Sequence, residues 1–192
     1  MREQKEKLEN ILKSDNPILF LDRDGVINRK IDSDYVRSWK DFEFIEGVMS
    51  ALKFLSRFFK RIIIVTNQRG IGRGLMSESE LNKIHSNMLK EFKENSIKID
   101  KIYYCGCDPE RDVNCNCRKP SPTMALRAKK DFPEIEFEKS IMVGDSKEDI
   151  EFGKRLGMLT VFLGDDTDIK ADFKFNCLKD FADFLEKVFG NW

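Results

Sequence analysis

The stretch ILFLDRDGVIN, residues 18–28, decides the fold of this chain. Its first four residues, Ile18–Leu21, are all apolar, which predicts a short buried strand. The strand runs directly into two carboxylates, Asp22 and Asp24. Side chains two positions apart on an extended chain point the same way, so these carboxylates repel each other unless a cation offsets their charge. The stretch therefore predicts a strand end that binds a metal ion, and oxygen ligands of this kind suit Mg²⁺.

Short apolar runs alternate with amphipathic segments along the rest of the chain. Predicted strands lie at 62–65, 102–105, 141–143 and 159–163, and predicted helices lie at 2–13, 47–58 and 178–188. The polar stretch 29–43 and the glycines at 70, 72 and 74 predict loops. Strands that alternate with helices pair in parallel, so we expect a doubly wound, Rossmann-like α/β sheet.

Two further helices are expected from their first residues. One begins at Ser77, an N-cap with Glu80 three residues later, and the other begins at Ser121. The apolar stripe of the first helix consists of Leu81, Ile84, Met88, Leu89 and Phe92. His85 falls on this stripe, so we expect a packed histidine without a catalytic role.

Length and composition narrow the classes of protein to consider. The 192 residues are 41% hydrophobic and contain no repeat or linker, which predicts a single domain over 1–192 with a helical extension at 1–16. Lys plus Arg equals Asp plus Glu at 34 each, so no global basic field points to nucleic acid. No apolar run approaches transmembrane length and residues 1–16 are too polar for a signal peptide. We therefore expect a cytoplasmic monomer that binds neither membrane nor nucleic acid.

Polar side chains also follow the other predicted strands. Thr66 follows one strand directly, Lys119 precedes the helix expected at Ser121, and Asp145 and Asp149 follow the strand at 141–143. In an open α/β sheet, ligands bind beyond the carboxyl ends of the strands, so these side chains are expected to meet there. Asp145 would complete the metal site, and Asp149 would support it through water or hydrogen bonds.

These residue types provide what phosphoryl transfer needs. The Asp22 carboxylate can attack phosphorus and form an aspartyl-phosphate, while Asp24 serves as general acid and then as general base. The Thr66 hydroxyl and the Lys119 ammonium can stabilise the equatorial oxygens of the transferred phosphoryl group. The sequence therefore predicts a phosphatase with four catalytic residues.

Four of the five cysteines are clustered as two CxC pairs, Cys105 with Cys107 and Cys115 with Cys117. Four thiolates can form a closed tetrahedral Zn²⁺ site, which leaves no open position for catalysis. We expect a structural zinc loop over 105–117, which holds the next residues, Arg118 and Lys119, over the phosphate site. The fifth cysteine, Cys177, is expected to be a core thiol.

Four stretches resemble the ordered motifs of the haloacid dehalogenase superfamily: FLDRDGVIN (20–28), VTNQRGIGRG (65–74), CRKPSP (117–122) and VGDSKEDI (143–150). The stretch YVRSWKDFEFIEGV (35–48) and the cysteine loop resemble the capless heptose-bisphosphate and histidinol-phosphate phosphatases within it. The resemblance implies that the Asp24 backbone carbonyl binds Mg²⁺ together with the side chains of Asp22 and Asp145. This chain departs from the family at Cys107, where a histidine is usual, and in its shorter loop.

The resemblance implies removal of the 7-phosphate from D-glycero-D-manno-heptose 1,7-bisphosphate, in nucleotide-activated heptose biosynthesis. Arg73 and Arg118 suit a second phosphate or sugar hydroxyls, since guanidinium binds oxyanions in bidentate fashion. Arg69 is either a solvated loop charge or an added substrate contact. The full set of expected substrate contacts is Asp32, Ser33, Tyr35, Asn67, Gln68, Arg69, Arg73 and Arg118.

Three other functions are weighed against this one. Histidinol-phosphate phosphatase shares the fold and the zinc loop, and a capless site can also admit a nucleic-acid 3′ end, although the neutral charge balance argues against it. A zinc-stabilised binding module without activity is disfavoured because the acid/base set is complete. The spacing of Gly70, Gly72 and Gly74 does not fit a dinucleotide fingerprint.

Overall fold

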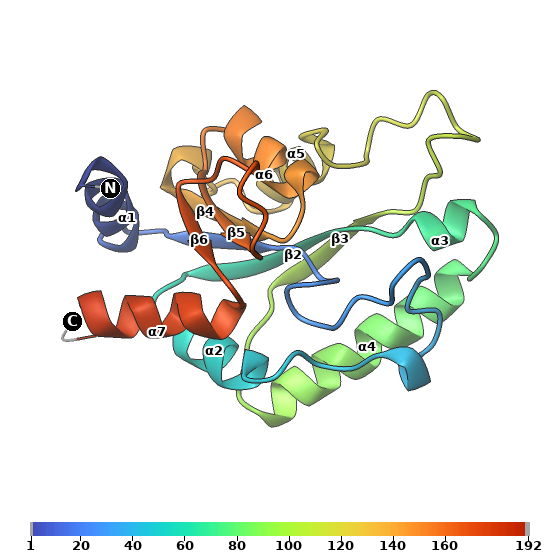
Figure 1. Ribbon diagram of the computed structural model, residues 1–192, viewed down its shortest axis with the longest axis horizontal. Coiled ribbons are helices and arrows are strands. Elements are labelled where there is room, and N and C mark those ends of the chain that lie inside the picture. The colour runs from blue at the N-terminus through green and yellow to red at the C-terminus, as the bar shows by residue number, and fades with distance from the viewer. Residues whose placement is uncertain (1, 191–192) are drawn as a thin grey trace.

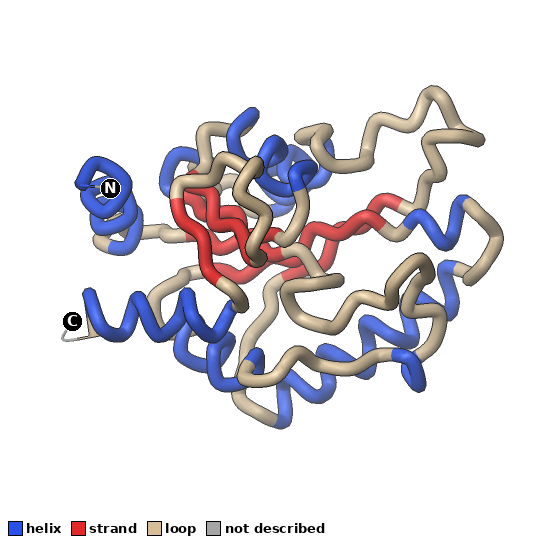
Figure 2. The backbone as a smooth tube through the Cα atoms, viewed as in Figure 1, coloured by secondary structure: helices blue, strands red, loops and turns tan. Residues whose placement is uncertain are grey.

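A parallel sheet of six strands, in the order β3-β2-β1-β4-β5-β6, forms the centre of the computed structural model, which describes residues 2–190 (Figures 1 and 2). Each pair of neighbouring strands is parallel, which confirms the predicted doubly wound α/β fold. The strands are β1 Ile18–Leu21, β2 Arg61–Asn67, β3 Lys101–Cys105, β4 Ser140–Gly144, β5 Leu159–Leu163 and β6 Phe173–Phe175.

The described residues form seven α-helices and two 3-10 helices, of which the first α-helix precedes β1 and the last follows β6. The α-helices are α1 Arg2–Leu12, α2 Val48–Leu55, α3 Arg69–Gly72, α4 Glu78–Glu94, α5 Thr123–Asp131, α6 Lys147–Arg155 and α7 Leu178–Phe189. The 3-10 helices are η1 Trp39–Asp41 and η2 Phe137–Lys139. Within residues 2–190, none of the helices combines the length and the hydropathy that crossing a bilayer requires.

Alternating strand residues divide the core into two layers, one on each face of the sheet. In β1, Leu19 and Leu21 pack with the apolar sides of α1, α2 and α7 and with part of α4. Ile18 and Phe20 point to the other face and pack with α5 and with Phe152 of α6. Figure 1 shows this arrangement, with α2, α4 and α7 on one side of the sheet and α5 and α6 on the other. Because both faces are covered, the central strand β1 is apolar and buried throughout.

The order of the strands places the site at a switch point. The chain moves outward from β1 through β2 to β3, and then returns to place β4 on the other side of β1. Leu21, the last residue of β1, pairs with Ile64 and with Val143, so the residues that follow β1, β2 and β4 lie side by side. Ligands bind at such points because the loops there diverge and leave a crevice.

Several element boundaries differ from the prediction. Helix α2 ends at Leu55 instead of residue 58, because the amides of Arg57 and Phe58 form tighter bonds to the carbonyls three residues before them. Helix α5 begins at Thr123 and not at Ser121. The Ser121 hydroxyl contacts the Asn116 carbonyl and accepts a hydrogen bond from the Thr123 amide at 3.4 Å. The strand β6 was not predicted, because three residues are too few to show alternation.

The predicted loop at 70–74 was wrong in part, since it contains the short helix α3. The Gly72 amide donates to the Gly106 carbonyl at 2.8 Å, and a Cβ on Gly72 would lie 2.3 Å from the Asp108 amide nitrogen. Glycine is therefore required at this position by the close approach of the cysteine loop, and not by the conformation of a free loop.

Two predicted core side chains were also placed wrongly. Leu89 is 37% exposed, because it lies about 100° round the helix from Met88, whereas His85 takes the remaining buried position on α4. Cys177 is half-buried at the N-cap of α7 and is not a core thiol.

The capping box predicted for α4 is present. The Ser77 hydroxyl accepts a hydrogen bond from the Glu80 amide, and the Glu80 carboxylate accepts one from the Ser77 amide at 2.6 Å. We predict that Ser77→Ala lowers the free energy of unfolding by about 1 kcal/mol. In a chain of this length that corresponds to a melting temperature lower by roughly 2–4 °C. Thermal melts followed by circular dichroism would measure this shift. Ser79→Ala, which changes an exposed serine within the same helix, is the control and should leave the melting temperature nearly unchanged.

Candidate active site

Asp22 is the first residue after β1 and lies at the switch point of the sheet. Its amide donates to the carbonyl of Val143 in β4 at 3.0 Å, which continues the strand pairing by one residue and fixes the backbone. Asp145 follows β4 directly, and Gly25 passes so close to Asp145 that a Cβ would meet its carboxylate at 1.9 Å. Gly25 also has a φ of +88°, a conformation that favours glycine. The backbone thus brings the loops after β1 and β4 into contact.

Lys119 reaches this point from the far end of the cysteine loop and is buried there. Its Nζ donates to Asp22 Oδ1 at 2.7 Å and to the Val65 carbonyl at 2.7 Å. It also forms an ion pair with Asp149 Oδ1 at 2.5 Å. Burial by itself lowers the pKa of Lys119, but the Asp149 and Asp22 carboxylates outweigh burial and raise that pKa. The ammonium therefore stays charged beside the Asp22 carboxylate.

Asn67, at the end of β2, attaches the Lys119 backbone to the sheet. Its Oδ1 accepts from the Lys119 amide at 3.0 Å, and its Nδ2 donates to the Lys119 carbonyl at 3.3 Å. An amide side chain can form this reciprocal pair because it carries both a donor and an acceptor. The position of the Lys119 ammonium is thus set from both its side chain and its main chain.

The three carboxylates at this point are crowded and carry more negative charge than the ammonium groups of Lys119 and Lys30 offset. Asp22, Asp145 and Asp149 each offer one oxygen, and the three oxygens lie within 4.8 Å of one another. Burial is the main cause that raises the pKa of Asp22 to about 7; Lys119 opposes this rise and the neighbouring carboxylates add to it. Burial also raises the pKa of Asp145. A divalent cation would reverse these shifts, because it favours the ionised carboxylates.

Asp22 and Asp145 are the residues that fit Mg²⁺. Asp145 Oδ1 is buried without a hydrogen-bond partner among the described residues, whereas Asp145 Oδ2 contacts the Lys30 ammonium. Asp149 fits the ion less well, because both of its oxygens already have partners: Oδ1 is paired with Lys119, and Oδ2 accepts from the amide and hydroxyl of Ser146. Asp149 thus positions Lys119 and caps α6, whereas its predicted support of the metal site through water or hydrogen bonds stays a prediction.

Asp24 is held apart from these carboxylates by three donors. Arg23 donates to both its oxygens at 2.9 and 3.0 Å, Asn28 Nδ2 donates to Oδ1 at 2.9 Å, and Gln68 Nε2 donates to Oδ2 at 2.8 Å. Burial would raise the pKa of Asp24, but Arg23 and these hydrogen bonds outweigh it and lower that pKa. The metal contact through the Asp24 backbone carbonyl stays a prediction.

Thr66 is fully buried in β2, and its Oγ1 accepts from Gln68 Nε2 at 2.8 Å. Because Gln68 also donates to Asp24, one side-chain amide orients two of the four predicted catalytic residues. The predicted role of the Thr66 hydroxyl in stabilising phosphate oxygens stays a prediction.

Two neighbouring cavities open on these residues and share Asp24, Lys30 and Asn67. The larger, of about 240 Å³, contains Asp22 and is also lined by Arg118, Lys119, Ser146, Glu148 and Asp149. The smaller, of about 160 Å³, is also lined by Arg23, Ile31, Asp34, Tyr35, Val36 and Gln68. The larger cavity, which contains Asp22, and the smaller cavity beside it together have room for a small phosphorylated molecule.

The cavities include some of the predicted substrate contacts and not others. Tyr35, Asn67, Gln68 and Arg118 line them. Asp32 and Ser33 do not line either cavity; both are exposed, and Ser33 has a φ of +59° in the turn there.

Arg69 and Arg73 are outside both cavities, and the structure gives them other partners. Arg69 pairs with the buried Asp108 at 2.6 Å and with Glu110 at 2.6 Å, and Arg73 lies 3.5 Å from Asp108. Asp108 directly follows Cys107, so these ion pairs attach the cysteine loop to α3. Arg69 is thus neither a free loop charge nor, in this structure, a residue of the substrate cavity.

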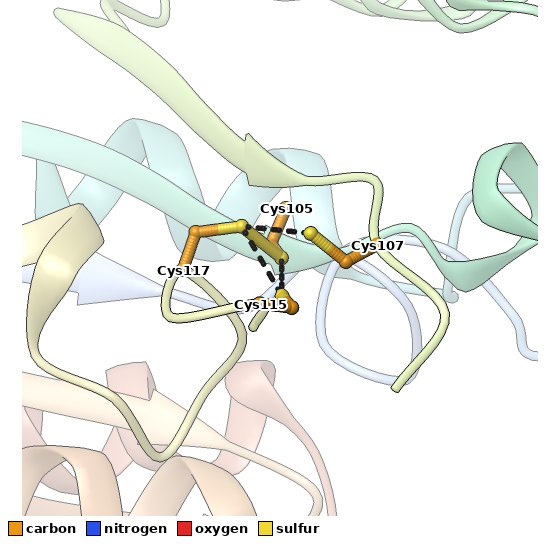
Figure 3. A group of neighbouring side chains, drawn as sticks. All are labelled: Cys105, Cys107, Cys115 and Cys117. Carbon is orange, nitrogen blue, oxygen red and sulfur yellow. Dashed lines mark hydrogen bonds between the residues drawn. A yellow bond between two sulfur atoms is a disulfide. The ribbon is translucent and has the colours of Figure 1, made fainter. Parts of the chain in front are cut away.

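The four clustered cysteines converge on one point, as Figure 3 shows. The sulfur atoms of Cys105 and Cys117 are joined as a disulfide, and other sulfur pairs are 3.5 to 3.8 Å apart. Four sulfurs about 2.3 Å from a zinc ion would be about 3.8 Å apart, so the reduced cluster has the ligand number and the spacing of a Zn²⁺ site. Burial, with a contribution from Cys115, raises the pKa of Cys107 to about 12, and a thiolate at this position therefore needs a metal ion beside it.

Arg23 and Lys30 are two of the site residues that the sequence did not predict. Arg23 alternates with Asp22 and Asp24, and this alternation could have predicted that it points into the core. Lys30 lies in the aperiodic stretch 29–43, whose pattern gives no signal. It reaches both cavities because bridges from Asn28 to Asp24 and Phe44 fold this stretch back over the sheet edge.

The chain is similar in sequence and in structure to known phosphatases. A family profile described as HAD-hydrolase-like matches residues 116–178. The chain is 41% identical to the D-glycero-alpha-D-manno-heptose-1,7-bisphosphate 7-phosphatase of Campylobacter jejuni over 88% of its own length and 95% of that protein. It is 42% identical to the D-glycero-beta-D-manno-heptose-1,7-bisphosphate 7-phosphatase of Vibrio cholerae, over 77% and 80% of the two chains. The structure of the B. bronchiseptica D,D-heptose 1.7-bisphosphate phosphatase with magnesium and phosphate superimposes with a TM-score of 0.77, at 25% identity over 88% of this chain and 98% of that chain.

Zinc binding can be tested on the cysteine cluster. We predict about one zinc ion per chain in protein purified under reducing conditions, with Zn–S distances of about 2.3 Å by X-ray absorption. Cys117→Ser should lose the zinc because it removes one of four ligands. Cys177→Ser, a cysteine outside the cluster, is the matched control and should keep it. Elemental analysis that found zinc-free wild-type protein, or equal zinc in both variants, would contradict the assignment.

Magnesium binding should be visible as a gain in stability. We predict that Mg²⁺ at about 100 times its dissociation constant stabilises the wild-type protein by ~2.7 kcal/mol, measured as a rise in melting temperature. Asp145→Asn should reduce this rise strongly, because it removes one of the two carboxylates that fit the ion. Asp165→Asn changes an exposed carboxylate and should not affect it. An equal response in all three proteins would place the Mg²⁺ site elsewhere.

Proposed function

The chain belongs to the D-glycero-D-manno-heptose-1,7-bisphosphate 7-phosphatase family, and we propose that it hydrolyses the 7-phosphate of this heptose bisphosphate with the help of Mg²⁺. The observation that carries the proposal is the buried Asp22 carboxylate, bound by Lys119 at the wall of a cavity that Asp24 also lines. A nucleophile, an acid/base group and a fixed positive charge thus meet in one space.

In the first step, one Asp22 oxygen attacks phosphorus, the new O–P bond forms, and the bond from phosphorus to the C7 oxygen breaks. Asp24 gives a proton to the departing oxygen. In the free protein Asp24 has a lowered pKa, but an anionic phosphate in the cavity raises the pKa of a neighbouring carboxyl group and favours its protonation. The Lys119 ammonium stabilises the charge on the transferred oxygens, and bound Mg²⁺ would supply further positive charge beside Asp22 and Asp145.

In the second step, a water molecule attacks the aspartyl-phosphate and Asp24 takes its proton. The bond between phosphorus and the Asp22 oxygen then breaks, which releases phosphate and restores the carboxylate. The proton that Asp24 gave to the leaving oxygen is therefore replaced by one from water, and the net reaction consumes one water molecule.

Substrate recognition is assigned to the space around the reaction centre. Arg118 lines the larger cavity and can bind a second anionic group or sugar hydroxyls, whereas Tyr35 lines the smaller cavity beside Gln68. The relatives include both anomeric classes at similar identity, so we assign the family substrate without choosing the anomer. We also propose that the chain is a single domain and acts as a monomer in the cytoplasm, where its clustered thiols stay reduced.

A phosphate-release panel tests this function. The panel contains both anomers of heptose 1,7-bisphosphate, histidinol phosphate and a 3′-phosphorylated oligonucleotide. We predict the highest kcat/KM for one of the heptose bisphosphates, with Mg²⁺ required, and loss of turnover after EDTA treatment until Mg²⁺ is added back. A preference for histidinol phosphate or for the oligonucleotide would overturn the substrate assignment.

The same panel identifies the nucleophile. Asp22→Asn should abolish turnover of every substrate while the fold persists, because it removes only the attacking oxygen. Circular dichroism supplies the check on folding. Wild-type rates in this variant would contradict the aspartyl-phosphate mechanism whichever substrate is preferred.

A further inference from the structure

Arg23 is a fully buried cation whose two terminal nitrogens have different partners. One, NH2, donates to both oxygens of Asp24, and the other, NH1, lies 3.1 Å from Nε2 of His85. The Arg23 Nε has no partner among the described residues, so the guanidinium is held only through its two ends. Arg23 thus joins the acid/base carboxylate to helix α4.

The chemistry of the contact determines the tautomer of His85. Arginine has five donors and no acceptor, so Nε2 of His85 must accept the hydrogen bond through its lone pair. His85 is consequently neutral, with its proton on Nδ1. Its side chain is 6% exposed, and its ring packs edge-on against Tyr104 with 6.1 Å between ring centroids. Helix and strand packing therefore fix the direction of this lone pair.

We propose that His85 is a positioning residue for Asp24, because it holds the guanidinium of Arg23 in the orientation in which that group binds the Asp24 carboxylate. The inference rests on the role of Asp24 as acid/base in the proposed function. A planar guanidinium binds in a rigid fork, so the acceptor at NH1 determines where NH2 points. Without His85, NH1 is left buried and unpaired, and the guanidinium must turn to satisfy it.

A structural role for His85 would look different from a positioning role. A packing defect in α4 lowers the activity toward all substrates equally. A displaced acid/base group affects substrates according to their leaving group, because an alkoxide must be protonated as it departs and a nitrophenolate need not be. The parameter kcat/KM reports steps only up to the departure of the leaving group, so it isolates this effect from hydrolysis of the aspartyl-phosphate.

The test compares His85→Leu, which has no acceptor, with His85→Gln, whose amide oxygen can accept from Arg23. For an alkyl phosphate we expect kcat/KM of His85→Leu to fall by roughly 10-fold or more, out of the ~10²–10⁴-fold that general acid catalysis provides. For 4-nitrophenyl phosphate the fall should be less than about threefold, and His85→Gln should recover most of the alkyl activity. Ile84→Val, the adjacent buried residue on α4, is the packing control and should show no dependence on the leaving group.

A second measurement does not depend on activity. His85 is the only histidine of the chain, so a ¹⁵N-imidazole NMR spectrum reports on this residue alone. We expect the neutral Nδ1–H form in the wild-type protein, and a changed Nε2 shift in Arg23→Lys. An Nε2–H tautomer would overturn the proposal, as would equal losses of His85→Leu on both substrate types or no loss on the alkyl phosphate. Failure of the wild-type protein on heptose bisphosphate would remove the proposed substrate only, since any accepted alkyl phosphate serves in this comparison.

Discussion

The site depends on one buried interaction, the contact of the Lys119 ammonium with the Asp22 and Asp149 carboxylates at the carboxyl edge of the sheet. An unpaired buried charge costs several kcal/mol, so the Lys119 ammonium needs at least one of these carboxylates, and each carboxylate is stabilised by the ammonium. Asp22, Asp149 and Asp145 together leave an excess of negative charge, and a bound divalent cation would compensate that excess. A site for Mg²⁺ thus follows from the same burial that orients the Asp22 carboxylate.

Lys119 can occupy this place only because the segment before it is held on several sides. The cysteine cluster ends two residues earlier at Cys117, and Asn67 pairs with the Lys119 backbone. At the other end of the loop, Asp108 binds arginines of the α3 segment, and Gly72 permits close contact. A loop with almost no apolar residues cannot form a core of its own, and a metal ion and ion pairs replace that core here.

Asp24 is organised by a separate set of contacts. Gln68 connects it with Thr66, and Arg23 connects it with His85 on α4. The proposed nucleophile, Asp22, and the proposed acid/base group, Asp24, are two residues apart in the chain. Asp22 lies beside two carboxylates and the Lys119 ammonium, whereas Asp24 is surrounded by donors. Burial, with the neighbouring carboxylates, raises the pKa of Asp22, whereas Arg23 and the other donors outweigh burial and lower the pKa of Asp24. Bound Mg²⁺ would favour the ionised Asp22 and an anionic phosphate would favour the protonated Asp24, so the loaded site reverses both shifts.

The sequence by itself determined the sheet class, because buried parallel strands must be apolar on both faces, and Ile18–Leu21 followed by Asp22 shows this pattern directly. It also determined the cysteine cluster, since the CxC spacing brings ligands together locally. Only the tertiary structure decided that Lys30 reaches the cavities, that Arg69 pairs with Asp108, and that His85 contacts Arg23. The physical reason is that a local pattern records which face of an element is buried. The partner that completes a buried polar group comes from a distant segment, and strand order and loop packing alone bring the two together.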